Sequence, residues 1–244
     1  MITFSSVTLP GGRAINEDSI KMTSVNENNM CFALADGLGG HGRGDEASAL
    51  AVKTASEVFA SEYLSERFLE NCFELAQERL LKKQEECHAR NSMKTTLVVL
   101  RTSENTVQWA HIGDSRLYFF NNNKLIQRTL DHSVPQMLVS AGEIKEKEIR
   151  NHPDRNRLLR VIGTEWTGLK YDVSMPVERT KNMAFLLCSD GFWELIEEKT
   201  MHKLLKKSQT VNQWLEAMTE EVTKNSVGKD MDNYSAIAVW VNND

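Results

Sequence analysis

The chain has 244 residues, of which 41% are hydrophobic and 26% are charged, and its formal net charge is −5 at pH 7. This length allows one domain with a large core or two small domains, and the composition is that of an ordinary globular protein. The acidic balance argues against a nucleic-acid-binding protein, which would normally show a basic stripe.

The N-terminal segment, MITFSSVTLPGGR, lacks the basic start and the long apolar stretch of a signal peptide. No apolar run elsewhere in the sequence approaches the length needed to cross a bilayer. We therefore expect a cytoplasmic protein that does not insert into membranes.

Short β-type runs come first in the chain, and two helical patterns follow them. The runs cover residues 2–9, 19–25 and 30–36. The alanine-rich stretch 45–59 favours a helix packed against a sheet. Apolar positions within 64–89 favour a second helix, and its many charges indicate a surface position.

Strands return after these helices. We expect them at 95–102, 106–113 and 116–129, the last as a hairpin around its asparagines. The charged, turn-rich segment 133–168 looks like an inserted lobe or flap. The segments expected after it are strands at 171–177, 182–189 and 235–241 and helices at 194–207 and 211–224.

No internal repeat and no Pro/Ser-rich linker divides the chain, so we expect a single domain over residues 1–244. Strands are grouped early and late, with paired long helices between them. This order fits an α+β layered sandwich better than a βαβ repeat.

Aspartates stand at one end of four separate strand-like runs. They are Asp36, Asp114, Asp190 and Asp232. Each alone could be a common turn or cap residue. If the strand ends converge, however, the carboxylates cannot lie together uncompensated. A hard divalent cation, Mg²⁺ or Mn²⁺, resolves this conflict, and two such ions ~3.5–4 Å apart can promote an in-line displacement at phosphorus.

The loop 37–42 matches GxGxxG between a strand and a helix, which is the context of a dinucleotide-binding fingerprint. Two features oppose that interpretation. Asp36 would place a negative charge beside the pyrophosphate, and the acidic residue expected on a second strand ~20 residues later is missing. The glycines more plausibly let the backbone approach a metal, with the Gly37 carbonyl as a ligand.

Five motifs together resemble the metal-dependent (type 2C) serine/threonine protein phosphatases in their bacterial single-domain form. The resemblance covers the chain from about Arg13 to Trp240. The motifs are Arg13-Ala-Ile-Asn-Glu-Asp-Ser, Asp36-Gly-Leu-Gly-Gly-His-Gly, Gly113-Asp-Ser-Arg, Ser189-Asp-Gly and Asp232-Asn.

This resemblance implies a four-layer α/β/β/α sandwich: two central antiparallel sheets flanked by helices, with a small flap insertion at 133–168. It also implies two Mn²⁺ or Mg²⁺ ions, with the weaker third ion often seen in the family. Asp36 would bridge the two ions, the Gly37 carbonyl would bind one of them, and Asp190 and Asp232 would complete the acids. A metal-bridging water would attack phosphorus directly.

Four further roles follow from the resemblance. Glu17 and Asp18 would hold metal-bound waters in place, and Asp114 corresponds to a ligand of the third ion. Arg13 would grip the substrate phosphate through its guanidinium fork. The implied partners are phosphorylated protein substrates and an opposing bacterial serine/threonine kinase.

The match also has departures. Leu38 stands where some relatives carry a histidine proposed as a general acid, and His41 lies too far along to inherit that role. Glu194 stands where some relatives supply an acid to the third metal, although it could equally be a solvated helix residue. Two rivals remain: a catalytically weak phosphoprotein-binding relative and a small-phosphoester hydrolase. The survival of Asp36, Asp190 and Asp232 counts against the first.

Overall fold

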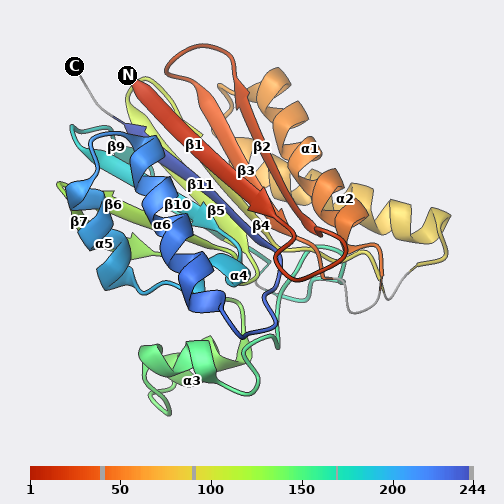
Figure 1. Cartoon of the computed structure of the whole chain (residues 1–244). Coiled ribbons are helices and arrows are strands. Elements are labelled where there is room, and N and C mark those ends of the chain that lie inside the picture. Colours follow the sequence, from red (N-terminus) through yellow and green to blue (C-terminus); the bar gives the residue numbers. More distant parts are fainter. Residues whose placement is uncertain (39–41, 90–91, 169, 242–244) are drawn as a thin grey trace.

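Two antiparallel sheets form the centre of the molecule (Figure 1). The structure is a computed structural model that describes residues 1–38, 42–89, 92–168 and 170–241. The first sheet has the order β1-β11-β10-β6-β7, namely Ile2–Leu9, Tyr234–Val241, Met183–Cys188, Arg116–Asn121 and Lys124–Arg128. The second has the order β2-β3-β4-β5-β8, namely Asp18–Ser24, Met30–Asp36, Leu97–Thr102, Thr106–Ile112 and Asp172–Val173, with β9 (Val177–Glu178) also paired with β5.

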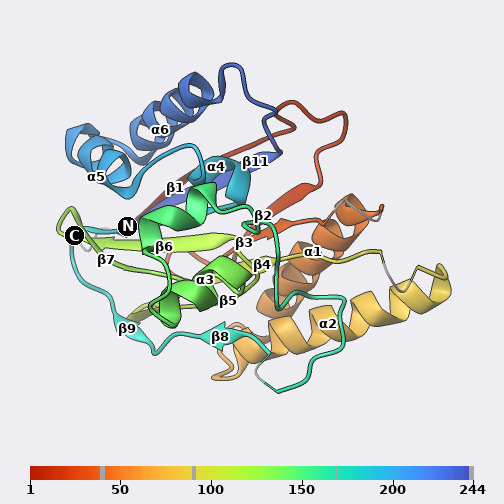
Figure 2. The same ribbon diagram turned by 90° about the horizontal axis from the view of Figure 1, so that it is seen from below.

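Helices cover the outer face of each sheet (Figure 2). α1 (Gly44–Glu62) and α2 (Phe68–Glu86) pack against the second sheet. α5 (Glu198–Lys207) and α6 (Val211–Ser226) pack against the first. A third apolar cluster lies between the sheets, so the predicted four-layer α/β/β/α sandwich is confirmed. Within the described ranges, no helix is long and apolar enough to span a bilayer.

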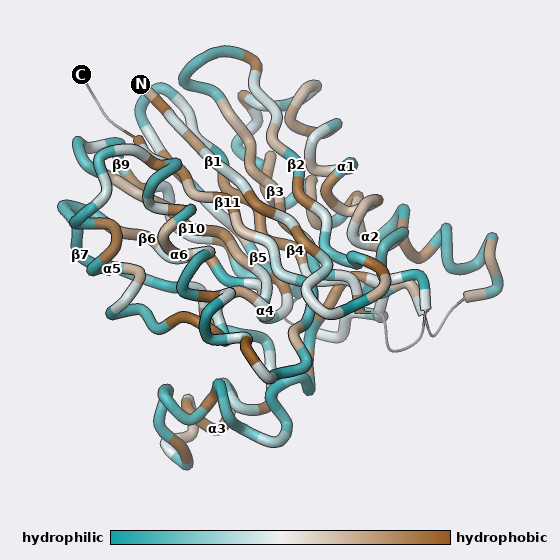
Figure 3. Tube along the Cα trace, viewed as in Figure 1, coloured by the Kyte–Doolittle hydropathy of each residue, from teal (hydrophilic) through white to brown (hydrophobic). Residues whose placement is uncertain are grey.

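The alternation of side chains along β3 explains why α1 is rich in alanine. Phe32 and Leu34 point into the cluster between the sheets, whereas Ala33 and Ala35 point toward α1. Small residues on both surfaces, such as Ala51 in the helix, let helix and strand approach closely. Hydrophobic segments accordingly run along the central strands, and the segment around α3 is mostly hydrophilic (Figure 3).

Strand β11 occupies an inner position in the first sheet although it comes last in the described chain. It pairs with β1 on one side, where Ile2 lies opposite Val241, and with β10 on the other, where Met183 lies opposite the same residue. The first and last strands are therefore neighbours, and the residues preceding β11 are brought beside the end of β10.

The segment between β7 and β8 forms a small lobe at one end of the sandwich (Figure 1). It contains α3 (Val134–Ser140) and the 3₁₀ helix η2 (Glu146–Asn151). Arg150 fastens this flap to the core, because its guanidinium donates to the carbonyl oxygens of Trp193 and Ile196 and to Glu198 Oε1 at 3.2, 3.1 and 2.8 Å.

Two secondary-structure predictions are wrong in detail. The helix expected over 194–207 begins only at Glu198, as α5, and a separate short helix, α4 (Asp190–Trp193), precedes it across a turn. Arg150 binds the carbonyl groups in that turn, so they do not continue a helix. The strand expected over 171–177 is split into β8 and β9, because Ser174 Oγ accepts the Trp109 N–H at 3.0 Å and Pro176 has no N–H to donate.

Candidate metal centre

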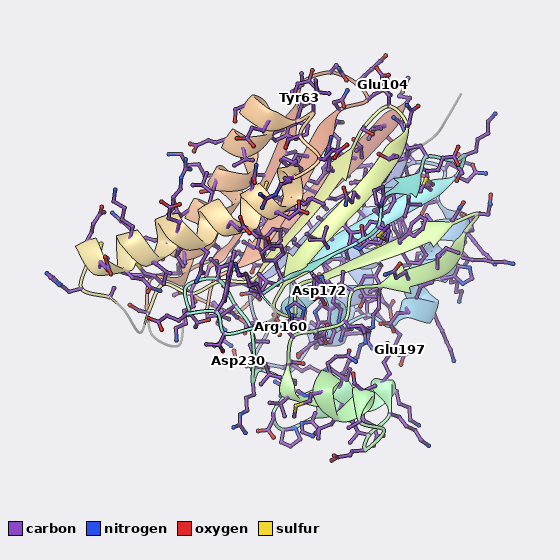
Figure 4. The ribbon with its side chains drawn as sticks, turned by 180° about the vertical axis from the view of Figure 1, so that it is seen from behind. Tyr63, Glu104, Arg160, Asp172, Glu197 and Asp230 are labelled. Atoms are coloured by element: carbon purple, nitrogen blue, oxygen red, sulfur yellow. The ribbon has the colours of Figure 1, made fainter. Side chains whose placement is uncertain are left out.

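The four strand-end aspartates do converge. They line one cleft of about 910 Å³, together with Arg13, Glu17, Gly37 and Leu38. Asp36 ends β3, Asp114 lies in the turn between β5 and β6, Asp190 begins α4 directly after β10, and Asp232 precedes β11. The flap contributes Asn156, Arg157 and Leu158 to the rim. Figure 4 shows this end of the sandwich at Asp230 and Arg160, with Glu104 at the opposite end.

Hydrogen bonds fix the backbone that carries Asp36. The Asp36 N–H donates to Thr96 Oγ1 at 2.9 Å, and the Thr96 N–H returns a bond of 2.9 Å to the Asp36 carbonyl. Thr96 Oγ1 also lies 2.7 Å from Ser115 Oγ, next to Asp114. On the other side, the Gly37 N–H donates to the Glu17 carbonyl at 3.1 Å. The end of β3 is therefore bound by hydrogen bonds to the residues that precede β4 on one side and β2 on the other.

Glycines allow this close convergence. A Cβ added to Gly37 would lie 2.1 Å from the carbonyl oxygen of Gly44, and one added to Gly191 would lie 2.2 Å from that of Asn233. Both contacts are with backbone atoms, which cannot rotate away. Gly191 thus allows the segment after β10 to approach the segment before β11, where Asp190 and Asp232 stand.

Replacing Gly191 with alanine is expected to destabilise the protein by about 2 kcal/mol or more and to remove most of its activity, because the added methyl group forces these two segments apart. Thermal unfolding and metal-dependent turnover would measure the two effects. Gly142→Ala is the control, because its methyl group would meet nothing within 4 Å. Its positive φ of 76° should cost only about 1 kcal/mol. Equal loss of activity in both variants would contradict the prediction.

The carboxylates of the cleft repel one another. Burial, followed by the charge of Asp190, raises the pKa values of Asp36 and Asp114 well above the ordinary value of 3.8. Burial and the charge of Asp232 raise the pKa of Asp190 to about 6. Burial also raises the pKa of Asp18 to about 7. The cleft therefore holds more negative charge than its own surroundings compensate.

The donor set fits a hard divalent cation. Asp18 is buried, and Ser189 Oγ donates to its Oδ2 at 2.7 Å. Among the described residues, its Oδ1 is a buried oxygen without a hydrogen-bond partner. The remaining candidate donors are carboxylate and carbonyl oxygens, which Mg²⁺ and Mn²⁺ prefer.

Arg13 lies beside this cluster, with its side chain 46% exposed. Its Nε and Nη2 donate to the two carboxylate oxygens of Asp232 at 3.1 and 3.0 Å. Asp230 lies 3.7 Å from Nη1. The guanidinium thus presents a two-pronged donor to an oxyanion at the edge of the cleft, the geometry that also binds phosphate.

Glu17 and Glu194 differ in their surroundings. Burial, followed by the charge of Asp45, raises the pKa of Glu17, which lines the cleft. Glu194 is not a freely solvated helix residue, because its side chain is 22% exposed and its Oε1 lies 3.1 Å from Arg155 Nε of the flap. Burial and the charge of Asp190 raise the pKa of Glu194 to about 7. His41 lies outside the described residues.

Asn233 is a positioning residue that the sequence did not reveal, although it belongs to the Asp232-Asn motif. Its Oδ1 accepts the Glu17 N–H at 2.8 Å. Its Nδ2 donates to the carbonyls of Pro10 and Ile15, both at 2.9 Å. Asn233 therefore shapes the loop that presents Arg13, and only long-range contacts, invisible in a single sequence, could reveal this role.

Comparison with known proteins gives consistent matches. The sequence model described as "Protein phosphatase 2C" matches residues 12–234. A serine/threonine phosphatase, stp, from Listeria monocytogenes is 32% identical over 232 residues, covering 92% of this chain and 89% of the relative.

Solved structures agree with the sequence matches. The crystal structure of a bacterial serine phosphatase superposes with a TM-score of 0.88 at 26% identity, covering 100% of this chain and 99% of the other. The catalytic domain of the serine/threonine protein phosphatase PstP, in complex with 2 manganese ions, superposes with a TM-score of 0.82 at 25% identity, covering 99% of each chain.

Proposed function

Since the chain belongs to the protein phosphatase 2C family, it is a serine/threonine protein phosphatase, and we propose that the aspartate cleft is its dinuclear Mn²⁺ or Mg²⁺ active site. The observation that carries this proposal is the convergence of four strand-end carboxylates on one cleft. Bound there, two such ions supply an activated water and offset the charge of the phosphoryl oxygens.

The proposed ligands divide by position. Asp36 experiences the charges of the four other aspartates in the cleft, so it is the group best placed to bridge two ions. Asp190 and Asp232 supply further carboxylates, and the Gly37 carbonyl supplies a neutral oxygen. Asp114, in the turn between β5 and β6 at the same cleft, is the proposed ligand of a weaker third ion.

The groups around these ligands have supporting roles. Glu17 lines the cleft and Asp18 lies deeper, so both are proposed to orient waters through their carboxylates. Arg13 is proposed to bind two oxygens of the substrate phosphate. Its guanidinium would then release the two carboxylate oxygens of Asp232 that it binds in this structure. No side chain of the cleft needs to accept the phosphoryl group.

The partners and the extent of the enzyme are also proposals. We propose phosphorylated proteins as substrates, an opposing bacterial serine/threonine kinase as regulatory counterpart, and a cytoplasmic location. We further propose that residues 1–244 act as one phosphatase domain, with the flap at about 133–168 bordering the cleft.

Phosphate release from a phosphothreonine peptide tests the proposed function. Wild-type protein is expected to release phosphate only with Mn²⁺ or Mg²⁺, and Asp36→Asn is expected to lose this activity. Glu104→Gln is the matched control, because this exposed acid lies at the opposite end of the sandwich (Figure 4). Metal-independent release, or full activity of Asp36→Asn, would sink the proposal. Preference for a small phosphoester over the peptide in competition would favour a small-phosphoester hydrolase instead.

A further inference from the structure

A second polar cluster, outside the proposed metal ligands, lies behind the turn that carries Asp114. It consists of His111 in β5, His132 in the connection after β7, and Asp172 in β8. The two imidazole rings stack with centroids 4.6 Å apart. One donor atom from each residue lies within 4.8 Å of the others, a spacing that a metal ion could use.

The hydrogen bonds of the two rings argue against a metal there. The Gly113 N–H donates to His132 Nδ1 at 3.2 Å, so Nδ1 is an acceptor and the proton of the neutral ring is on Nε2. Nε2 in turn lies 3.2 Å from Asp172 Oδ2, to which it donates. His111 Nε2 donates to the Leu130 carbonyl at 2.8 Å. A metal on His132 Nε2 would move that proton to Nδ1, against the Gly113 N–H.

The same contacts suit a positioning role. The His132 backbone N–H donates to the Gly113 carbonyl at 2.9 Å, while its ring accepts from the Gly113 N–H, so one residue binds both polar groups of Gly113. That carbonyl belongs to the peptide unit that includes the Asp114 nitrogen. On the other side, Trp193 Nε1 donates to the Asp114 carbonyl at 3.0 Å. The backbone of Asp114 is thereby held at both ends.

Asp172 fixes the orientation of the ring. Its second oxygen lies 3.3 Å from Arg160 Nη1, and Figure 4 shows the two side chains close together. Burial, followed by the neighbouring His111, lowers the pKa of His132 to about 4, so the ring is neutral near pH 7 and keeps its acceptor. The chain of contacts thus runs from Arg160 through Asp172 and His132 to Gly113.

Gly113 transmits this constraint toward the main site. Its φ is 97°, and a Cβ there would lie 2.5 Å from the Thr96 side chain. Thr96 accepts the Asp36 N–H and contacts Ser115, so the Gly113 turn packs against the residue that fixes Asp36. A displaced turn would move the Asp114 carboxylate first.

We propose that His132 is a positioning residue that, with its tautomer set by Asp172, holds the Gly113 turn so that the Asp114 carboxylate faces the metal cleft. This inference rests on the proposed function, because it takes Asp114 as a ligand of the weaker metal ion. Residues that support metal ligands in this way typically change metal affinity 10–100-fold when mutated.

A pair of amide variants tests this role. His132→Asn places an acceptor oxygen near the position of Nδ1 and keeps the bond from Gly113, whereas His132→Gln places its amide near Nε2 and loses it. Hydrogen exchange at the Gly113 amide should stay slow in the first and become fast in the second. Calorimetric Mn²⁺ titration should show the weakest site, identified by its loss in Asp114→Asn, weakened about 10-fold in His132→Gln and less than about 3-fold in His132→Asn.

Equal Mn²⁺ affinities in the two variants, or a titration of wild type that Asp114→Asn leaves unchanged, would overturn the proposal. Thermal unfolding of the metal-free variants controls for a general loss of stability, which would affect both amides and all sites together. Phosphate release by the wild type is measured in parallel. If phosphate release is metal-dependent but the Mn²⁺ titrations give either of these two results, the proposed function stands and only the proposed role of His132 is wrong.

Discussion

Replacing Asp190 with asparagine is expected to inactivate the enzyme and yet to stabilise its metal-free form. Activity should fall by more than about 100-fold. Mutating residues that only support metal ligands already lowers activity about 10–100-fold, and the loss of a ligand itself should be larger. Without metal, however, the charge of Asp190 raises the pKa values of its neighbours Asp36, Asp114 and Glu194. Removing one of several repelling charges should raise the melting temperature at pH 7.5 by about 5 °C, since 1 kcal/mol corresponds to about 2–4 °C in a protein of this size.

Turnover with Mn²⁺ and thermal unfolding in a chelator measure the two effects on the same preparation. Asp154→Asn is the matched control for stability, because it makes the same chemical change on the exposed surface of the flap. Its melting temperature should remain that of the wild type. A lower melting temperature for metal-free Asp190→Asn would show that the asparagine loses more in hydrogen bonding than it gains in reduced repulsion.

The pH dependence of stability should change sign when metal binds. Folded-state pKa values of about 7 for Asp18 and about 6 for Asp190 exceed the ordinary value of 3.8. Between about pH 4 and 7 the folded metal-free chain therefore binds more protons than the unfolded chain, and its stability falls as the pH rises. His132 acts in the opposite sense between its ordinary value of 6.5 and about 4, but it is one group against several carboxylates.

Thermal unfolding from pH 5 to 8, with a chelator or with excess Mn²⁺, measures this effect. Without metal, the free energy of unfolding should decrease by about 3 kcal/mol or more toward pH 8, since each pKa unit corresponds to ~1.4 kcal/mol. With Mn²⁺ at about 1,000 times its dissociation constant, binding adds about 4 kcal/mol. Stability should then increase with pH, because protons compete with the metal for the carboxylates. Parallel pH profiles in the two conditions would contradict the prediction.

The sandwich was predictable because its signals are local or belong to motifs. Apolar runs and their spacing predicted the central strands and the two long helices, and the family motifs predicted how the sheets pack. The break after Trp193 was not predictable, because it depends on Arg150, which is 43 residues away in sequence and binds the carbonyl groups of that turn.

The site shows the same division. Aspartates at strand ends predict a metal centre from sequence alone, and the structure places Asp36, Asp114, Asp190 and Asp232 together. The supporting residues carry no such sequence signal. A lone histidine or asparagine has many ordinary uses in a sequence, and the two contacts of His132 with Gly113 appear only in three dimensions.

The inner position of β11 affects how the protein can be synthesised. Residues 2 and 241 are paired in one sheet, so the strand beside both β1 and β10 is absent until almost all of the chain described here has left the ribosome. Until then Asp232 is missing from the cleft, and two strand edges are exposed to pairing with other chains. We therefore expect unfinished chains to be inactive and prone to aggregation, and dephosphorylation to begin only after residue 241 has emerged.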